Sequence, residues 1–334
     1  LDPQHEEAQR FRDFAVAASA AGPTLLSATG GTPAVEATGS AGAMSVEAAL
    51  EEIAGLVPLP LVATRVIEAA NNEAVTMDEL ARLIGTDPAL TTRLLSVANS
   101  AFYGGRMKRV ATIKEAITLL GIREIRSMAL GVCMVQAIPP GRVVSQQDFW
   151  RFSLAVATLA DLLARSAGSL RGDAFSAGIV HNIGLMALDL YRPEALRRAI
   201  ELRGPLLRRL HDREQQVFGF TDAELGAALA RRWGLPEPIV EVIETHGFRP
   251  DEVPATSELA RQVIGARIYV RSQGLSDGVE QSEAGLPPVE WNSGPLAVTM
   301  ERIGGLDGIL RRTDEFLRLA PGTATGEGPA QRVA

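Results

Sequence analysis

The residues that could carry chemistry are a few imidazoles and carboxylates in the second half of the chain. His181 and His246 offer ring nitrogens, and Asp222 and Glu224 offer carboxylate oxygens. These are ligand types that divalent cations favour in proteins. One hypothesis is a metal site assembled from His181, Asp222 and His246, and another is a ligand pocket without metal. We favour a plainer interpretation, in which His181 hydrogen-bonds across the core and the two carboxylates begin a helix.

The remaining candidate groups fit no catalytic template. His211 lies in an arginine-rich amphipathic segment and His5 near the start, and neither has metal-ligand spacing to the other histidines. Cys133, the only cysteine, falls in the apolar run 128–138 with no base nearby, which predicts a buried, reduced thiol. That run is too short to span a bilayer, and no glycine-rich phosphate loop follows a predicted strand. We therefore expect no catalytic residue, metal, cofactor or membrane partner.

Arginines gather between residues 192 and 232. Arg197, Arg198, Arg208 and Arg209 are candidates for binding an anionic partner, such as a cyclic dinucleotide or an acidic protein surface. The plainer alternative is two solvated helix faces, because acidic residues are interspersed. The net charge of −7 and the lack of a recognisable helix-turn-helix argue against a DNA partner.

The elements that must position these residues are predicted to be all helical. Only 5% of the residues are aromatic, and no run of alternating β-branched residues suggests a strand. Capping boxes at 76–79, 112–115 and 221–224 mark three helix starts. The predicted helices cover 46–53, 61–71, 76–85, 87–99, 112–121, 123–137, 150–167, 174–190, 193–202, 206–218, 221–234, 237–246, 258–272 and 300–319.

The chain also divides by composition. Residues 1–44 include a tract rich in Ala, Gly, Ser, Thr and Pro, which predicts a flexible segment. Residues 45–250 form the predicted domain. Residues 251–320 form a helical extension with a loop near 273–295, and residues 321–334 form a disordered tail.

The stretch 87–104 is the clearest local signal. Asp87 is placed to accept hydrogen bonds at the start of a helix, and Pro88 suits its first position. Asn99 and Ser100 are expected to cap this helix and pack its turn against the second half of the domain. Tyr103 precedes two glycines that release the chain into a turn.

This stretch and three further motifs resemble the HDOD module, a bacterial signalling domain related to the metal-dependent HD phosphohydrolases. The other motifs are 112–121, which ends at Gly121, then 178–184, and 226–236, which contains Trp233 and Pro236. They occur in the family's order between residues 45 and 249. The resemblance implies a bundle of helices in two halves.

The resemblance also implies where a metal would sit in an active relative. Such relatives use a first histidine, a His-Asp pair and a later aspartate. Here Phe152 stands where a histidine is frequent, and the pair reads His181-Asn182. Asp222 and His246 stand at two further positions where related domains often carry histidine. We interpret these five residues as the vestige of an HD site, and we expect no enzymatic activity.

The resemblance implies a non-catalytic, cytoplasmic module of bacterial signal transduction that contacts another signalling protein, in motility or second-messenger signalling. An alternative is a metal-dependent phosphohydrolase or phosphodiesterase with an altered HD site, which predicts bound metal and loss of activity in His181→Ala. A third hypothesis is a cyclic-dinucleotide receptor that uses the arginine cluster.

Overall fold

The computed structural model describes residues 45–54, 61–72, 74–100, 109–168, 173–202, 207–248, 254, 257–279 and 294–319. All regular structure in these ranges is helical, which confirms the prediction of an all-α fold. The predicted flexible segment 1–44, the tail 321–334 and Tyr103 lie outside the described residues. The division of the chain into domains stays a prediction.

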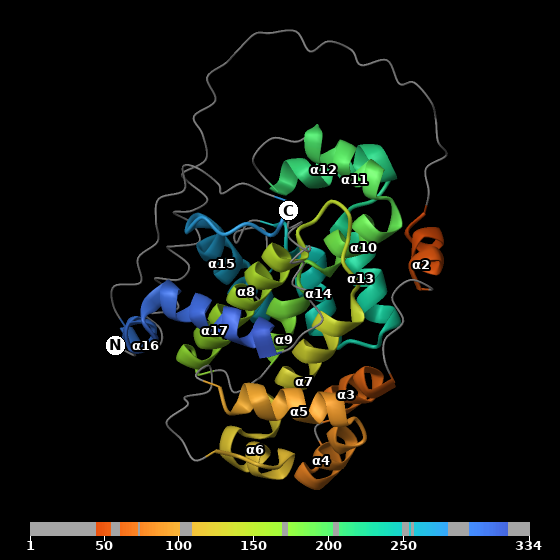
Figure 1. The fold of residues 1–334 in the computed structure, drawn as a ribbon. Helices are drawn as coiled ribbons and strands as arrows, with labels where there is room; N and C mark the ends of the chain where they lie inside the picture. Colours follow the sequence, from red (N-terminus) through yellow and green to blue (C-terminus); the bar gives the residue numbers. More distant parts are fainter. Residues whose placement is uncertain are drawn as a thin grey trace, which may run out of the picture.

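Two groups of helices are joined by helix α7 (Figure 1). The first group lies at the lower end of the view, and α7 leads from it into the second. The first group comprises α3 (Leu61–Asn71), α4 (Met77–Gly85), α5 (Pro88–Ala98) and α6 (Ile113–Leu120), followed by α7 (Ile122–Ala137). Most residues of α7 are buried, including Cys133, and burial raises the pKa of that thiol to about 12.

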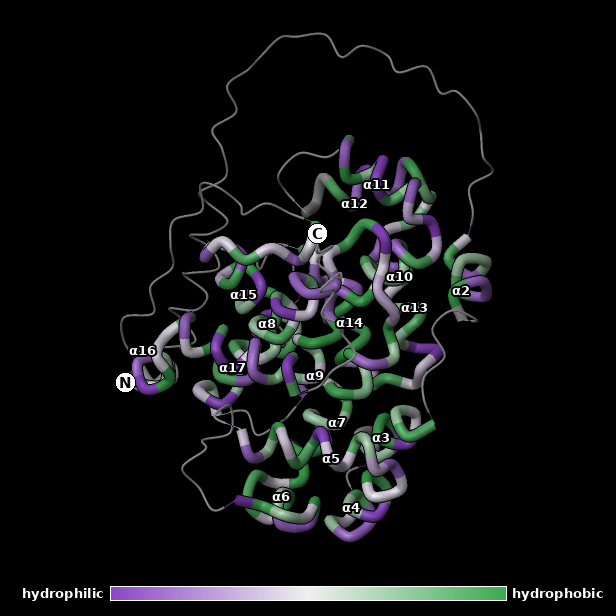
Figure 2. The backbone as a smooth tube through the Cα atoms, viewed as in Figure 1, coloured by the Kyte–Doolittle hydropathy of each residue, from purple (hydrophilic) through white to green (hydrophobic). Residues whose placement is uncertain are grey.

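The second group surrounds α8 (Gln146–Ser166), which contacts α9, α15 and α17. Elsewhere in this second group, α10 packs against α13, and α11 packs against α12. Its helices are α9 (Asp173–Val180), α10 (Ile183–Tyr191), α11 (Pro193–Glu201), α12 (Leu207–Phe218), α13 (Asp222–Arg232), α14 (Glu237–Thr245), α15 (Glu258–Ser272), α16 (Gly294–Ile303) and α17 (Gly305–Leu319). Figure 2 shows mainly apolar residues along the central helices α9 and α14, and many hydrophilic residues along α11 and α12.

The first described helix belongs with the second group. Helix α2 (Val46–Ala54) contacts α10 and α13. Two ion pairs fasten its polar face: Arg192 to Glu52 at 3.1 Å and Arg232 to Glu51 at 2.5 Å. Two arginines from the predicted anion-binding region therefore have acidic partners within the chain.

The predicted helix starts are largely confirmed. Asp87 accepts hydrogen bonds from the N–H groups of Ala89 and Leu90, and Pro88 opens α5. The capping boxes that begin α4 and α13 are complete. The third is altered, because Glu115 accepts from the N–H of Ala111 instead of the N-cap residue. Gly121 ends α6 with a φ of 95°, a conformation that favours glycine.

Asn99 and Ser100 cap the end of α5, as expected. The side-chain amide of Asn99 donates to the carbonyls of Leu95 and Val110, and its oxygen accepts from the N–H of Val110. The Ser100 hydroxyl donates to the carbonyl of Val97. Asn99 thus joins the end of α5 to the segment before α6, and the expected packing of this turn against the second half stays a prediction.

Two predicted helices are each divided in two. The predicted helix 174–190 turns at residues 181–182, between α9 and α10, and the predicted helix 300–319 is interrupted at Gly304. The stretch Asp173–Tyr191 is long and apolar enough to cross a membrane, but 94% of its most apolar window is buried inside the protein. Such burial is typical of a core helix, so we assign α9 and α10 to the core.

Candidate functional site

The turn between α9 and α10 places His181 in the core with one ring nitrogen fixed. Its Nδ1 lies 2.7 Å from the carbonyl oxygen of Gly178, and a carbonyl only accepts, so Nδ1 carries the proton. Its Nε2 is buried and has no hydrogen-bond partner among the described residues. The bond expected across the core is therefore a local bond within the same turn.

The side chains of Phe152 and Asn182, at two of the other four vestigial HD positions, contact an internal ion pair. The Arg271 guanidinium lies 5.3 Å from the centre of the Phe152 ring and 2.6 Å from Asp277. The amide of Asn182 donates to the same carboxylate at 3.5 Å. Phe152, Asn182, Arg271 and Asp277 are all at least 99% buried. Asn182 is the N-cap residue of α10, but its side chain makes no capping bond there.

A second polar cluster lies beside this pair, on the other side of His181. The His246 ring is 5.9 Å from the His181 ring, and the His211 ring is 5.5 Å from that of His246. Asp222 sits between the last two, with Oδ1 2.7 Å from His211 Nε2 and Oδ2 3.7 Å from His246 Nε2. One ligand atom from each of these three residues lies within 4.8 Å of the others.

Close helix approach creates this cluster. Gly184 lies at the start of α10, where a Cβ atom would come within 1.8 Å of the Asp222 carbonyl oxygen. Gly247 follows α14, where a Cβ atom would fall 2.1 Å from Cε1 of His211. Only glycine leaves room for the two approaches. These positions bring α13 against α10, and the His211 ring against the end of α14.

Electrostatics hold Asp222 in its charged form and His246 in its neutral form. Burial alone would raise the pKa of Asp222, but His211 and His246 outweigh it and hold that pKa well below the usual value. Burial lowers the pKa of His246, although Asp222 opposes this. Burial also lowers the pKa of His181 well below the usual value, and His246 and Arg267 add to the shift.

The structure brings together only some of the residues that the sequence singled out. Asp222 and His246 meet, and the third potential ligand within 4.8 Å is His211, which we had set aside, while the His181 ring lies 5.9 Å from the His246 ring. Glu224 stays in the capping box that begins α13. No pattern in the sequence signals His211, because its position depends on how α12 lies against α13 and α14.

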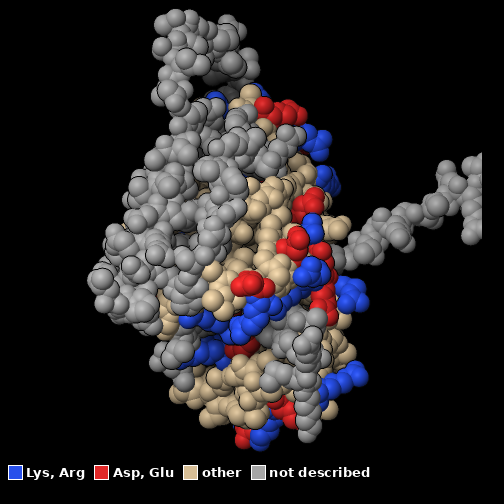
Figure 3. Space-filling view, turned by 90° about the vertical axis from the view of Figure 1, so that its left-hand side faces the viewer, with Lys and Arg blue, Asp and Glu red and all other residues tan. Residues whose placement is uncertain are grey.

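The predicted arginine patch is described only in part. Arg197 and Arg198 are exposed on α11, and Arg197 lies 4.0 Å from Glu194. The side chains of Arg208 and Arg209 lie outside the described residues. On the face in Figure 3, basic and acidic groups adjoin one another in a band.

The motif around Trp233 and Pro236 has a structural role. Trp233 caps the end of α13, and Pro236 is the N-cap residue of α14. The turn between them sets the direction of α14, whose end carries His246.

The two parts of this centre differ in their fitness for a metal. At the HD positions Phe152 offers no donor atom, the Asn182 amide is a neutral ligand engaged with Asp277, and Arg271 already supplies a positive charge. The HD ligand set therefore does not fit a metal ion. The cluster of His211, Asp222 and His246 combines two imidazoles and a carboxylate, a set that fits a divalent transition metal.

Comparison with known proteins places the fold in a family. Residues 56–247 match the model of the HDOD domain. An uncharacterised protein of Treponema pallidum (strain Nichols) is 29% identical over 220 residues, or 64% of this chain. The aligned region covers 42% of the Treponema protein, so this chain matches less than half the length of that relative.

Solved structures show the same fold. An HDOD domain protein of unknown function from Geobacter sulfurreducens is 25% identical, with a TM-score of 0.57, over 83% of this chain and 94% of that one. A candidate phosphohydrolase from Shewanella amazonensis SB2B is also 25% identical, with a TM-score of 0.61, over 83% and 98%. A candidate signal transduction protein from Marinobacter aquaeolei VT8, 22% identical with a TM-score of 0.59 over 83% and 64%, is similar in fold. Because the domain model matches more than half of its residues, the chain belongs to the HDOD family, which is related to the HD-type phosphohydrolases.

Proposed function

We propose that this chain is a catalytically silent regulatory module of bacterial signal transduction that acts by contact with another signalling protein. The observation that carries this proposal is the identity of the residues at two of the HD positions. Phe152 and Asn182 are buried against the Arg271–Asp277 pair. Metal-dependent hydrolysis needs an ion that activates water and polarises the phosphoryl group, and these side chains cannot hold one.

Burial of the centre supports the same proposal. His181, Asn182, Asp222 and His246 are each at most 1% exposed, whereas the His211 side chain is 14% exposed. A phosphoester of any size would have to displace packed helices to reach the buried groups. The centre therefore suits a structural or regulatory role better than turnover of a substrate.

An assay for hydrolysis tests the silent character of the module. The full chain is incubated with bis(4-nitrophenyl) phosphate and with cyclic dinucleotides, each in the presence of Mn²⁺, Fe²⁺ or Zn²⁺. We expect no turnover above that of the metal alone. Metal-dependent turnover that is lost in His181→Ala or Asp222→Asn would overturn the proposal.

The partner surface that we favour is the exposed face of α11, with Arg197 and Arg198. Photocrosslinking of the full chain in its native cells should give a defined adduct from this face. In Arg197→Glu combined with Arg198→Glu we expect its yield to fall at least about tenfold, because like charges across an interface cost several kcal/mol. The control Arg302→Glu, at an exposed arginine of α16, should leave the yield unchanged. An unchanged adduct in the double variant would reject this face.

A second candidate function is the metal-dependent phosphohydrolase with an altered ligand set. The specific observation in its favour is the grouping of His211, Asp222 and His246 within metal-ligand range. It requires both bound metal and turnover, so the hydrolysis assay separates it from the regulatory module. The cyclic-dinucleotide receptor has weaker support, because Arg197 faces Glu194 and much of the patch is not described. Titration with a labelled cyclic dinucleotide tests it, and a lack of saturable binding removes it.

A further inference from the structure

The second cluster contains acceptor atoms that face one another. His246 Nδ1 lies 2.7 Å from the carbonyl oxygen of Ile243, so the proton is on Nδ1 and a lone pair is on Nε2. That lone pair faces Asp222 Oδ2 at 3.7 Å. Two acceptors facing each other in the core repel unless a cation lies between them. Both atoms are buried without a hydrogen-bond partner among the described residues.

His211 completes the arrangement from the third side. Its Nε2 lies 2.7 Å from Asp222 Oδ1, within ion-pair distance, but the two atoms make no hydrogen bond of regular geometry among the described residues. A pair this close without a proper hydrogen bond is unusual for an imidazole and a carboxylate. Three side chains from three separate elements therefore converge without satisfying one another.

The distances match the needs of a metal ion. Zinc lies about 2.0 to 2.2 Å from nitrogen and oxygen ligands, which places neighbouring ligand atoms of a tetrahedral site about 3.3 to 3.6 Å apart. The two measured separations of 2.7 and 3.7 Å lie on either side of that range. Adjustments of about 0.6 Å for the first and about 0.1 Å for the second would bring both into it.

We propose that His211, Asp222 and His246 bind one divalent transition-metal ion of the class that favours imidazole and carboxylate ligands, such as Zn²⁺. The ion links α12, the first turn of α13 and the end of α14. Two of its ligands, Asp222 and His246, stand at vestigial HD positions, whereas His211 does not, and the site uses neither Phe152 nor the His181-Asn182 pair. The inference goes beyond the proposed function, because it requires no hydrolysis.

The surroundings favour a cation at this cluster over the HD positions. Glu214 is fully buried and accepts the backbone N–H of Asp222 at 3.0 Å, so a second carboxylate lies close by. His181, in contrast, faces the positive charges of Arg267 and Arg271. The hydrogen bond from His246 Nδ1 to the Ile243 carbonyl is also the kind of support that orients a metal-binding imidazole.

Titration of the full chain with Zn²⁺ tests the site. The protein is stripped with a chelator, and affinity is measured by competition with a chromophoric chelator, with the metal content determined by elemental analysis. We expect one Zn²⁺ per chain and no comparable binding of Mg²⁺. Removing a ligand should cost more than the 10- to 100-fold loss typical of a supporting residue, so we expect at least about a hundredfold loss in His211→Ala and in Asp222→Asn.

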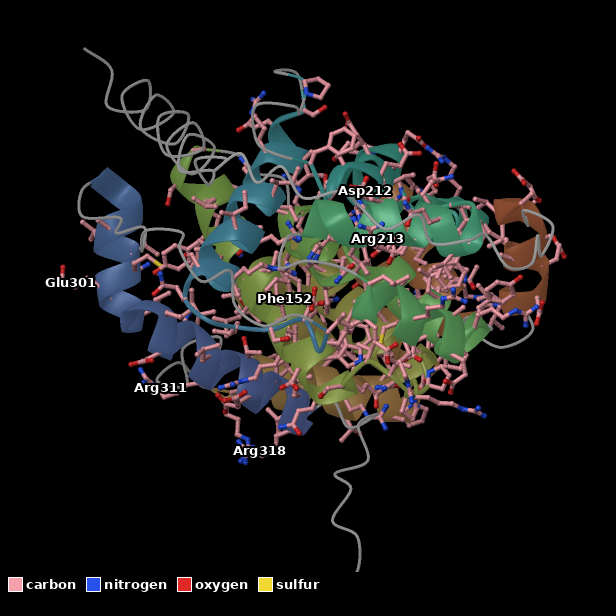
Figure 4. All side chains as sticks on the ribbon, turned by 90° about the horizontal axis from the view of Figure 1, so that it is seen from above. Phe152, Asp212, Arg213, Glu301, Arg311 and Arg318 are labelled. Carbon is pink, nitrogen blue, oxygen red and sulfur yellow. The ribbon has the colours of Figure 1, made fainter. Side chains whose placement is uncertain are left out.

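Matched controls separate the site from nonspecific binding. Asp212→Asn removes an exposed carboxylate beside His211 on α12, and Figure 4 shows it away from the central Phe152. His5→Ala removes a histidine outside the cluster. Both should bind Zn²⁺ as the wild type does. His211→Ala changes a partly exposed residue, so its circular dichroism should confirm that it folds.

Three outcomes would overturn the site: no Zn²⁺ binding, binding unchanged in a folded His211→Ala, or binding lost in His5→Ala. The failure of the site and the failure of the proposed function are distinguishable. Zn²⁺ binding without turnover supports both proposals. Turnover by the Zn²⁺-loaded protein overturns the silent module but not the site, and absence of binding overturns the site but not the module.

Discussion

Two charged centres lie side by side in the second half of the domain, and they balance their charges in different ways. At the HD positions, Arg271 supplies a cation from within the chain and Asp277 pairs with it. At the neighbouring cluster, Asp222 faces two imidazoles, and His246 is held neutral. The first centre contains its own guanidinium cation, whereas the second groups one carboxylate with two imidazoles. The two lie on either side of His181.

The difference separates two roles that a metal ion combines in a hydrolase. A guanidinium can hold neighbouring helices together, but it cannot activate a water molecule as a metal ion does. The Arg271–Asp277 pair keeps the structural role at the HD positions. In our proposal the metal ligands are His211, Asp222 and His246, away from Phe152 and the turn that carries Asn182.

The largest expected effect comes from breaking the internal ion pair. Asp277→Ala leaves the Arg271 charge buried with its main partner removed, and we expect a loss of about 3 to 5 kcal/mol in the free energy of unfolding. The control is Asp314→Ala, because Asp314 pairs with Arg151 at 2.8 Å on the surface and should cost less than about 1 kcal/mol. Urea titration measures both. Equal losses would show that the first centre is not the stabilising one.

The next effect concerns the second centre alone. Gly247→Ala places a Cβ atom 2.1 Å from the His211 ring and must push that ring away. We expect Zn²⁺ affinity to fall about 10- to 100-fold, as when a supporting residue of a metal site is lost. The matched control is Gly85→Ala, where the added Cβ meets open space. Unchanged affinity in Gly247→Ala would mean that His211 is not a ligand.

A pH dependence follows from His181, which lies between the two centres. Burial lowers its pKa, so the folded protein leaves it neutral, while the unfolded chain protonates it below about pH 6.5. Its contribution to stability is present above that pH and is lost as the pH falls. In His181→Leu the decline in unfolding free energy between pH 7 and 5 should flatten, by at most about 1.4 kcal/mol per pH unit. An unchanged slope would contradict the buried neutral state.

The smallest expected effect concerns the carboxylate of Asp161, whose pKa is shifted in the opposite direction to that of Asp222. Burial and the nearby Glu124 raise the pKa of Asp161 to about 6, whereas imidazoles hold that of Asp222 low. Stability from Asp161 is therefore full below about pH 4 and is lost as the pH rises through 6. Asp161→Asn should abolish this decline in the free energy of unfolding. We expect the decline to be no more than about 1 kcal/mol, because the partner Arg165 is exposed. Thermal unfolding of the wild type and the variant at pH 4 and pH 7 measures the difference. A larger loss of stability between these pH values in the variant than in the wild type would contradict the raised pKa of Asp161.

The sequence predicts the helices well where local chemistry marks their ends. Asp87-Pro88 and Gly121 do so, because a capping side chain or a positive φ acts within a few residues. The break between α9 and α10 has no such mark, since both flanks are apolar and buried. The turn depends instead on His181 bonding to the carbonyl of Gly178 and on close helix packing.

The candidate site was predictable only in part. His246 stands out because the chain has only 4 histidines, and the resemblance implied the positions of both Asp222 and His246. His211 and the Arg271–Asp277 pair could not be found in the same way. Their contacts depend on how α12 and α15 lie against their neighbours, which a one-dimensional pattern of charges does not specify.

Anomalous X-ray diffraction at the zinc edge, on crystals of the full chain grown with Zn²⁺, tests the central contrast most directly. We expect one strong peak bounded by His211, Asp222 and His246, with the Arg271–Asp277 pair intact beside it. A peak at His181-Asn182, or none when Zn²⁺ is saturating, would contradict the separation of the two centres.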